Sequence, residues 1–135
     1  MSRSQKFFMP MIPPTVTHQA KQLTVTKKGR PILHDSAELK DAILKLESNL
    51  LKHIPENKFT GPIRLVTQWF FPVTGKHVPG TYKTTKPDSD NSHKMLKDCM
   101  TRLKWWNDDA EVSSDIAEKF WAPDIPGILV EVIQL

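Results

Sequence analysis

The segment over residues 63–71, Ile-Arg-Leu-Val-Thr-Gln-Trp-Phe-Phe, constrains the fold more than any other part of the chain. It is rich in β-branched and aromatic residues, which favour strands. Pro62 and Pro72 lie on either side of it and mark its ends. The segment therefore predicts a strand that is buried on both faces or nearly so, and the chain must build a sheet around it.

Three further strands are expected around this one. One opens the chain at residues 5–9, and two close it at residues 112–121 and 128–135, with the turn Ala-Pro-Asp-Ile-Pro-Gly between them. Residues 10–34 are expected to form a loop, in which Lys28-Gly29 could form the turn of a small hairpin.

The first of two expected helices runs from a cap at Asp35 or Ser36 to about His53, and Glu38 is placed as in a capping box. Its core stripe comprises Leu39, Ala42, Ile43, Leu46 and Leu50. Two flanking residues, Leu44 and Leu51, widen that stripe. The wider face is either extra core or a subunit contact.

The second helix is expected from about Ser92 to Leu103. Its core face carries Met95, Leu96, Cys99, Met100 and Leu103. A line on the opposite face includes Lys94, Lys97 and Lys104. That line is a phosphate-contacting stripe or merely a solvated face.

The chain as a whole predicts one α+β domain over residues 1–135, a small mixed sheet with two helices. With 135 residues and 39% hydrophobic content it can form a sizeable core. Pro10, Pro13 and Pro14 break the apolar amino terminus, which excludes a secretory signal, and no other stretch could cross a bilayer. Cys99 alone allows neither a disulfide nor a thiolate zinc site, which suits a reducing cytoplasm.

Charge is divided unevenly along the chain. Residues 1–86 carry 14 Lys and Arg against 5 Asp and Glu, whereas residues 87–135 carry 5 against 10. The net charge of +4 favours a polyanionic partner. A basic surface with carboxylates at a few points is what a metal-dependent nuclease needs, because the cations gather phosphates while the carboxylates hold divalent ions against them.

A turn-rich basic arm covers residues 73–87. Its lysines could contact a sugar-phosphate backbone, and Tyr82 could stack on a base. A solvated hairpin arm without a ligand explains the same composition. The expected DNA contacts, in the arm and elsewhere, are Lys28, Arg30, Lys76, Lys83, Lys86 and Lys97.

Two acidic pairs flank the second helix. Asp88 and Asp90 lie two residues apart just ahead of it, so in an extended segment their carboxylates project to the same side and could share a cation. Asp108 and Asp109 follow a helix that would be roughly 18 Å long, so they reach the first pair only if the next strand runs back beside the helix. On spacing alone a helix cap and a polar turn are the commoner explanations of the two pairs.

Two segments carry a family resemblance. They are Asp88-Ser89-Asp90-Asn91-Ser92-His93-Lys94 and Trp106-Asn107-Asp108-Asp109-Ala110-Glu111-Val112. In order and spacing they closely resemble the RusA family of Holliday junction resolvases, whose pattern is Asp-x-Asp-Asn, a Lys three residues on, and Trp-x-Asp-Asp-Ala-x-Val after the helix. His93 stands where the family commonly has Gln, and Lys104 where a Gly often ends the helix.

The resemblance implies a nuclease site that uses Mg²⁺, with Mn²⁺ able to substitute. Asp88, Asp90 and Asp109 would ligate the metal, Asp108 would support them, and Lys94 would stabilise charge at the scissile phosphate. These residue types suit that chemistry, because Mg²⁺ prefers carboxylate oxygens and waters, and a lysine beside it acts as a compact point charge.

The expected function is a metal-dependent endodeoxyribonuclease that resolves four-way (Holliday) DNA junctions by paired nicks in opposing strands during recombination and repair. A four-way junction has approximate two-fold symmetry, so a homodimer with two sites is the economical design. The alternatives are a less selective nuclease for branched or single-stranded DNA, and a non-catalytic nucleic-acid-binding module. A cytoplasmic protein of bacterial, phage or prophage origin is expected, with neither a membrane nor a small-molecule cofactor as partner.

Overall fold

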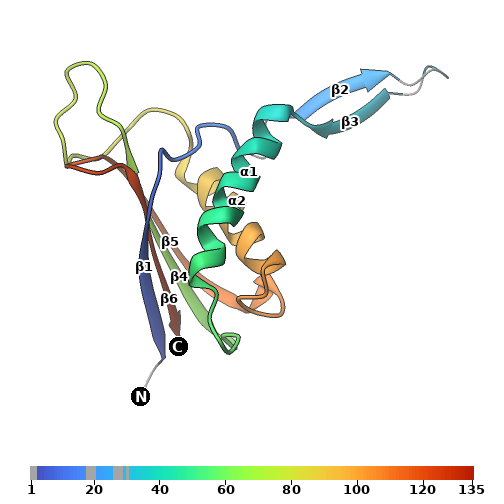
Figure 1. Cartoon of the computed structure of the whole chain (residues 1–135), viewed down its shortest axis with the longest axis vertical. Coiled ribbons are helices and arrows are strands. Elements are labelled where there is room, and N and C mark those ends of the chain that lie inside the picture. Colours follow the sequence, from blue (N-terminus) through green and yellow to red (C-terminus); the bar gives the residue numbers. More distant parts are fainter. Residues whose placement is uncertain (1–2, 18–20, 26–28, 30) are drawn as a thin grey trace.

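The computed structural model describes residues 3–17, 21–25, 29 and 31–135, with residues 21–25 and 31–35 described by their backbone alone. Two helices lie on one face of a four-stranded sheet, and a two-stranded hairpin stands away from both (Figure 1). The sheet contains β1 (Ser4–Pro10), β6 (Gly127–Gln134), β4 (Ile63–Phe71) and β5 (Val112–Trp121), in that order. No helix in the described part of the chain is long and apolar enough to cross a membrane.

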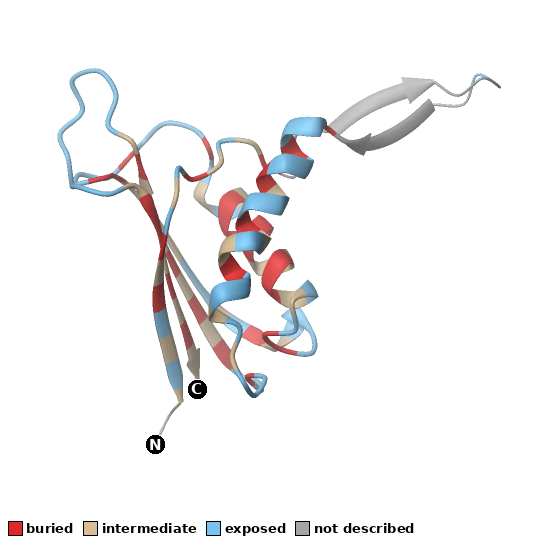
Figure 2. Cartoon of the chain, in the orientation of Figure 1, coloured by how far each residue is buried: buried red, intermediate tan, exposed pale blue. Residues whose placement is uncertain are grey.

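The sheet is mixed, as predicted. β4 pairs in parallel with β5 and antiparallel with β6, which is antiparallel to β1. Along β4 the residues alternate between buried and half-buried, because the helices cover only one face of the sheet (Figure 2). The prediction of burial on both faces therefore holds fully for the inner face and in part for the other.

The predicted loop before the first helix contains a regular hairpin of β2 (Lys21–Val25) and β3 (Pro31–Asp35). Gly29 between these strands has a φ of 79°, a conformation that glycine adopts without strain. The neighbouring residues, among them Lys28 and Arg30, lie outside the described residues, so their expected DNA contacts stay predictions.

The first helix, α1 (Ala37–Leu50), begins as expected. Ser36 is its N-cap, and the Ser36 hydroxyl accepts a hydrogen bond from the Leu39 N–H at 3.1 Å. A short 3-10 turn, η1 (Leu51–His53), carries the chain on to the predicted end. The capping box with Glu38 is wrong, because a cap at Ser36 places Leu39, not Glu38, at the third helical position.

The second helix, α2 (Ser89–Arg102), begins three residues earlier than the predicted start at Ser92, with Asp88 as its N-cap. This earlier start brings Ser92 and His93 into the helix, where both are buried, and the predicted core residues are buried with them except for the half-buried Leu103. The prediction that Asp90 belongs to an extended segment is therefore wrong, since Asp90 lies in the first turn of α2.

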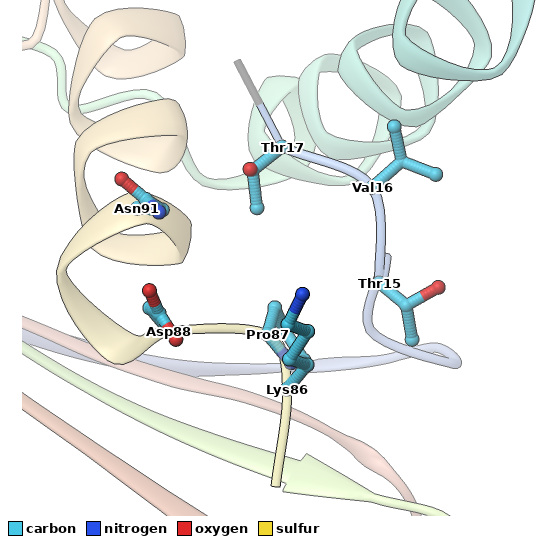
Figure 3. A pocket seen from close by; sticks show the side chains of 7 residues that line it. All are labelled: Thr15, Val16, Thr17, Lys86, Pro87, Asp88 and Asn91. Atoms are coloured by element: carbon cyan, nitrogen blue, oxygen red, sulfur yellow. The ribbon is translucent and has the colours of Figure 1, made fainter. Parts of the chain in front are cut away.

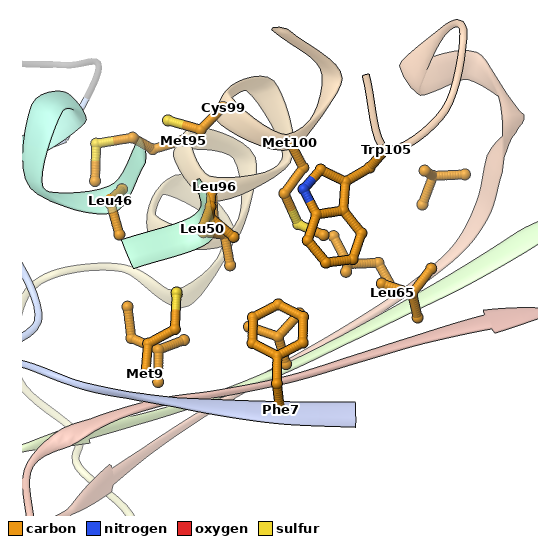
Figure 4. Close-up of a cluster of buried hydrophobic side chains, with 14 of the residues drawn as sticks. Phe7, Met9, Leu46, Leu50, Leu65, Met95, Leu96, Cys99, Met100 and Trp105 are labelled. Carbon is orange, nitrogen blue, oxygen red and sulfur yellow. The ribbon is translucent and has the colours of Figure 1, made fainter. Parts of the chain in front are cut away.

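The core fills the layer between the sheet and the helices (Figure 4). Phe7 and Met9 of β1 face Leu46 and Leu50 of α1, and α2 adds a further group. That group consists of Met95, Leu96, Cys99 and Met100, all buried. Burying each large apolar side chain contributes about 1.5–3 kcal/mol, so this layer holds both helices firmly on the sheet.

Candidate active site

The first turn of α2 lies at the end of the sheet where β4 and β5 finish. Lys119 of β5 holds the segment before the helix, because its ammonium donates to the carbonyls of Thr85 and Pro87, each at 2.7 Å. These bonds place Asp88, the residue after Pro87, above the end of β5. The helix start is therefore fixed to the sheet by side-chain bonds as well as by the core.

Asp88 and Asp90 line two different pockets. Asp88 belongs to a pocket of about 400 Å³, here called the loop pocket, which is lined by Thr15, Val16, Thr17, Lys86, Pro87, Asp88 and Asn91. Asp88 and Asn91 face the N-terminal loop across it (Figure 3). Asp90 belongs to a second pocket of about 310 Å³, here called the strand pocket, which is lined by Ser89, Asp90, His93, Lys94, Lys97, Asp115 and Ala117.

The carboxylates of Asp88 and Asp90 are exposed and available. Asp88 caps α2 through its backbone alone, and among the described residues neither carboxylate has a hydrogen-bond or ion-pair partner. The nearby N–H groups at the start of α2 favour negative charge. Both carboxylates can therefore accept a hard cation or polar ligand without breaking a contact.

The second acidic pair divides into one bound and one free carboxylate. Asp108 caps the 3-10 turn η2 (Asp109–Glu111), because its carboxylate accepts from the Ala110 N–H at 2.9 Å. Glu111 completes a capping box with Asp108, because its carboxylate accepts from the backbone N–H groups of Asn107 and Asp108. Asp109 is exposed and has no such partner within the described chain. The structure thus gives Asp108 a capping role and leaves Asp109 free.

Glu111 also joins η2 to the sheet. Its carboxylate accepts from the Gly61 N–H at 3.1 Å, just ahead of β4. The backbone N–H groups of Gly61 and Asp108 lower the pKa of Glu111, because they favour its charged form. Glu111 therefore holds the start of β5 beside the start of β4.

Within one copy of the chain, Asp109 lies apart from Asp88 and Asp90. It precedes β5, whose first residue, Val112, pairs with Ile63 at the start of β4. α2 has 14 residues and is about 21 Å long, and it separates Asp109 from the first acidic pair. Among the residues that the structure describes, no three His, Cys, Asp or Glu side chains gather where they could hold a metal ion.

The strand that follows Asp109 does run back beside α2, as the metal-site prediction required. The acidic residue that it brings to the strand pocket is Asp115. The sequence did not indicate Asp115, because it lies outside both acidic pairs. His93 was expected to be a solvated or core histidine that departs from a family pattern, without a role at the site. The signal in the sequence is the alternation of β5, which places Asp115 on the same face as Ala117.

The predicted cations differ in availability. Lys94 of the strand pocket and Lys76 and Lys86 of the arm are exposed. Lys97 is partly neutralised, because its ammonium lies 3.2 Å from the Asp115 carboxylate. Lys83 is buried, so its charge is not presented on the surface of the arm.

Three bonds hold the Lys83 ammonium in place. It donates to the Thr85 hydroxyl at 2.6 Å, to the Thr85 carbonyl at 3.1 Å and to the Lys86 carbonyl. It also lies 4.9 Å from the centre of the Trp121 ring. Burial and the nearby Lys119 lower the pKa of Lys83. The prediction that Lys83 contacts DNA is not supported by this geometry.

Comparison with known proteins places these residues in a family context. The family described as Endodeoxyribonuclease RusA matches residues 11–133. A crossover junction endodeoxyribonuclease rusA from Lactococcus phage r1t is 33% identical over 69 residues, which cover 50% of this chain and 53% of that protein. The chain thus matches about half the length of this curated relative.

Proposed function

The chain belongs to the RusA family of endodeoxyribonucleases, and from that premise we propose that it is a divalent-metal-dependent nuclease that resolves four-way DNA junctions by paired nicks. The observation that carries this proposal is the presence of three uncommitted carboxylates, those of Asp88, Asp90 and Asp109, in a chain of net charge +4. Free carboxylates on a cationic protein suit a divalent ion held against a phosphodiester.

These three carboxylates fit Mg²⁺, and Mn²⁺ as its substitute, because both ions take oxygen ligands and keep several waters. When bound, the ion supplies Lewis-acid stabilisation of the phosphate and acidifies a water molecule. Asp108 is a poorer ligand candidate than its neighbour, since its carboxylate already accepts from the Ala110 N–H. It would support the site by holding η2 in place.

The ligand set is complete only when two copies of the chain meet. Asp109 lies at the opposite end of the sheet from Asp88 and Asp90, so a homodimer would have to place Asp109 of one copy beside Asp88 and Asp90 of the other. A two-fold axis then creates two equal sites, which matches two nicks in a substrate of approximate two-fold symmetry. Each site would draw residues from both copies.

The exposed cations divide between catalysis and binding. Lys94 shares the strand pocket with Asp90, and within the described chain it has no partner, so its charge is available to the scissile phosphate. Lys76 and Lys86 lie earlier in the chain, on the exposed arm, and would contact the sugar-phosphate backbone. Lys97 would contribute less, because Asp115 already pairs with it.

A labelled four-way junction tests the proposal directly. The protein should cut the junction at opposing strands with Mg²⁺ or Mn²⁺ and leave it uncut in EDTA. Asp88→Asn, Asp90→Asn and Asp109→Asn should each abolish cutting while junction binding persists, because the ligand is lost but the basic surface remains. Equal cutting of flaps and single strands would indicate the less selective nuclease. Binding without cutting at any metal concentration would indicate a non-catalytic module and overturn the proposal.

A further inference from the structure

A chain of hydrogen bonds runs from the core to the strand pocket. The Trp69 indole N–H donates to the Thr67 hydroxyl at 2.9 Å, and that hydroxyl lies 2.7 Å from Nδ1 of His93. All three side chains are buried, His93 with 5% of its surface exposed. Because buried polar groups are costly to leave unpaired, these bonds fix the position of the His93 ring.

Donor chemistry gives the chain a direction. An indole nitrogen can only donate, so the Thr67 oxygen accepts from Trp69. At the other end a carboxylate can only accept, so Nε2 of His93 donates to Asp115. Nδ1 of the neutral ring is then unprotonated and accepts from the Thr67 hydroxyl, and the ring proton lies on Nε2. That nitrogen lies 2.7 Å from Oδ1 of Asp115. Each hydrogen bond is thus donated in the same direction, from Trp69 through Thr67 and His93 to Asp115.

The outer end of this chain lies in the strand pocket. The Asp115 side chain is 39% exposed, and its second oxygen accepts from the Lys97 ammonium at 3.2 Å. His93 therefore ties the early part of α2 to two strands at once, through Thr67 of β4 and Asp115 of β5. Asp90 and Lys94 lie beside His93 on α2, and within the described chain no side-chain bond holds either of them.

We propose that His93 and Asp115 are positioning residues for the cleavage reaction, which set the placement of Asp90 and Lys94 in the strand pocket. The inference rests on the proposed function, because Asp90 is an expected metal ligand and Lys94 the expected phosphate contact. Residues that orient metal ligands without touching the substrate commonly change activity or metal affinity by about 10–100-fold when they are replaced. A residue that only fills the core would change stability instead.

Two substitutions of His93 separate these roles. His93→Leu keeps much of the volume but breaks both ring bonds. His93→Gln can restore them, since an amide can accept from the Thr67 hydroxyl and donate to Asp115. With junction saturated by protein, His93→Leu should cut roughly 10-fold or more slowly, with a junction Kd within about 2-fold of wild type, and His93→Gln should recover most of the rate.

A second pair of variants controls for loss of stability. Thr67→Val removes both bonds of the Thr67 hydroxyl, to Trp69 and to His93. Thr101→Val also removes two hydroxyl bonds, at the other end of α2, where the Trp106 indole N–H donates to the Thr101 hydroxyl at 2.8 Å and that hydroxyl donates to the Lys97 carbonyl. Both variants should melt at lower temperature, but only Thr67→Val should slow cleavage. Equal cleavage rates in the two variants would overturn the proposal.

Binding of Mn²⁺, followed by electron paramagnetic resonance of the free ion, gives a readout that needs no cleavage. His93→Leu should weaken Mn²⁺ binding about 10-fold, and His93→Gln should restore it. If the wild type cuts junctions while His93→Leu cuts and binds Mn²⁺ equally well, the positioning role is wrong and the nuclease stands. If the wild type cuts no junction, the nuclease is wrong. The Mn²⁺ comparison then decides alone whether His93 places Asp90.

Discussion

The acidic residues of this chain differ in what already binds them. Backbone N–H groups hold Asp108 and Glu111 at the turn before β5. Asp109, between them in sequence, is exposed and free of such contacts within the described chain. A carboxylate engaged with backbone donors stabilises the fold, whereas a free one can bind a cation. The two adjacent aspartates should therefore respond differently to substitution.

Alanine substitution at each position tests this difference. Asp108→Ala should lower the free energy of unfolding by about 1 kcal/mol, the usual loss for an N-cap. Asp109→Ala should leave the melting temperature unchanged and abolish junction cleavage. Thermal denaturation and cleavage assays on both variants give the comparison. A destabilised Asp109→Ala, or an Asp109→Ala protein that cuts normally, would contradict the assignment.

Substitution of the lysine at the site should have a different effect from substitution of the lysines on the arm. Lys94→Ala should mainly lower the cleavage rate, because its charge is needed as the transition state forms. Lys76→Ala and Lys86→Ala should weaken binding, and each should flatten the salt dependence of log Kd by about one unit of slope. Binding measured between low and moderate salt, beside single-turnover cleavage, distinguishes the two effects. A Lys94→Ala protein with a normal rate would remove Lys94 from the site.

His93 predicts a pH dependence of stability. Burial lowers the pKa of His93 from its usual 6.5, although Asp115 acts in the opposite direction. When the folded-state pKa lies below the unfolded one, the stabilisation is fully present above the unfolded pKa and is lost as pH falls through the folded pKa. The free energy of unfolding should therefore decline as pH falls below about 6.5, and decline less in His93→Gln. Urea denaturation at several pH values measures both, and identical profiles would contradict the prediction.

At the level of elements, the sequence predicted most boundaries and misplaced the start of α2. Asp88, Asp90, Asn91 and Ser92 are all good capping residues, so local propensity did not distinguish among four starting points. The tertiary structure does, because a cap at Asp88 brings the buried Ser92 and His93 into the helix and lets His93 bond to Thr67 and Asp115 of the sheet. A boundary set by packing could not be found from the capping residues alone.

The pairing of β4 with β5 also could not be predicted from the sequence. A parallel pair needs a crossover connection, and α2 provides it. The periodicity of residues 63–71 and 112–121 predicts strands but not their neighbours or their direction. The sequence places Asp88 and Asp109 at opposite ends of the helix, but it does not show that β5 runs back beside α2 and brings Asp115 to the strand pocket. The separation of the two motifs could thus be predicted from the sequence, whereas the contribution of Asp115 could not.

The end of α2 gives a prediction about stability. Lys104 has a φ of 66°, and its N–H donates to the Thr101 carbonyl while the Trp105 N–H donates to the Met100 carbonyl. This is a Schellman motif, in which the left-handed position favours glycine. Lys104→Gly should raise the free energy of unfolding by roughly 1 kcal/mol, since a side chain is strained there. Lys104→Ala is the matched control and should give no such gain. An equal gain in both variants would assign the effect to the lost charge.

At the level of the whole molecule, two surfaces could join two copies. Leu44 and Leu51 are 62% and 59% exposed, so they widen the surface of the α1 region and not the core. The edge strand β5 offers another contact, because the arm covers it only near its end, where the Lys83 N–H donates to the Lys119 carbonyl at 3.0 Å. Two β5 strands paired antiparallel would bring the start of each near the end of the other, and so Asp109 towards the partner's Asp88. We therefore favour the β5 edge.

Mixing two inactive variants tests whether each site is shared between copies. In a dimer of Asp88→Asn with Asp109→Asn, a shared arrangement puts both changes in one site and leaves the other intact. The mixture should therefore regain nicking, and on a cruciform plasmid it should give nicked circles, because one site cuts one strand. Asp88→Asn mixed with Asp90→Asn is the matched control and should stay inactive, since both residues come from the same copy and each site loses one.

Two outcomes would contradict the shared site. If the first mixture is also inactive after verified subunit exchange, the site lies within one chain and must form by a rearrangement that brings Asp109 to Asp88. Sedimentation that shows only monomers at micromolar concentration would rule out a site shared between two copies.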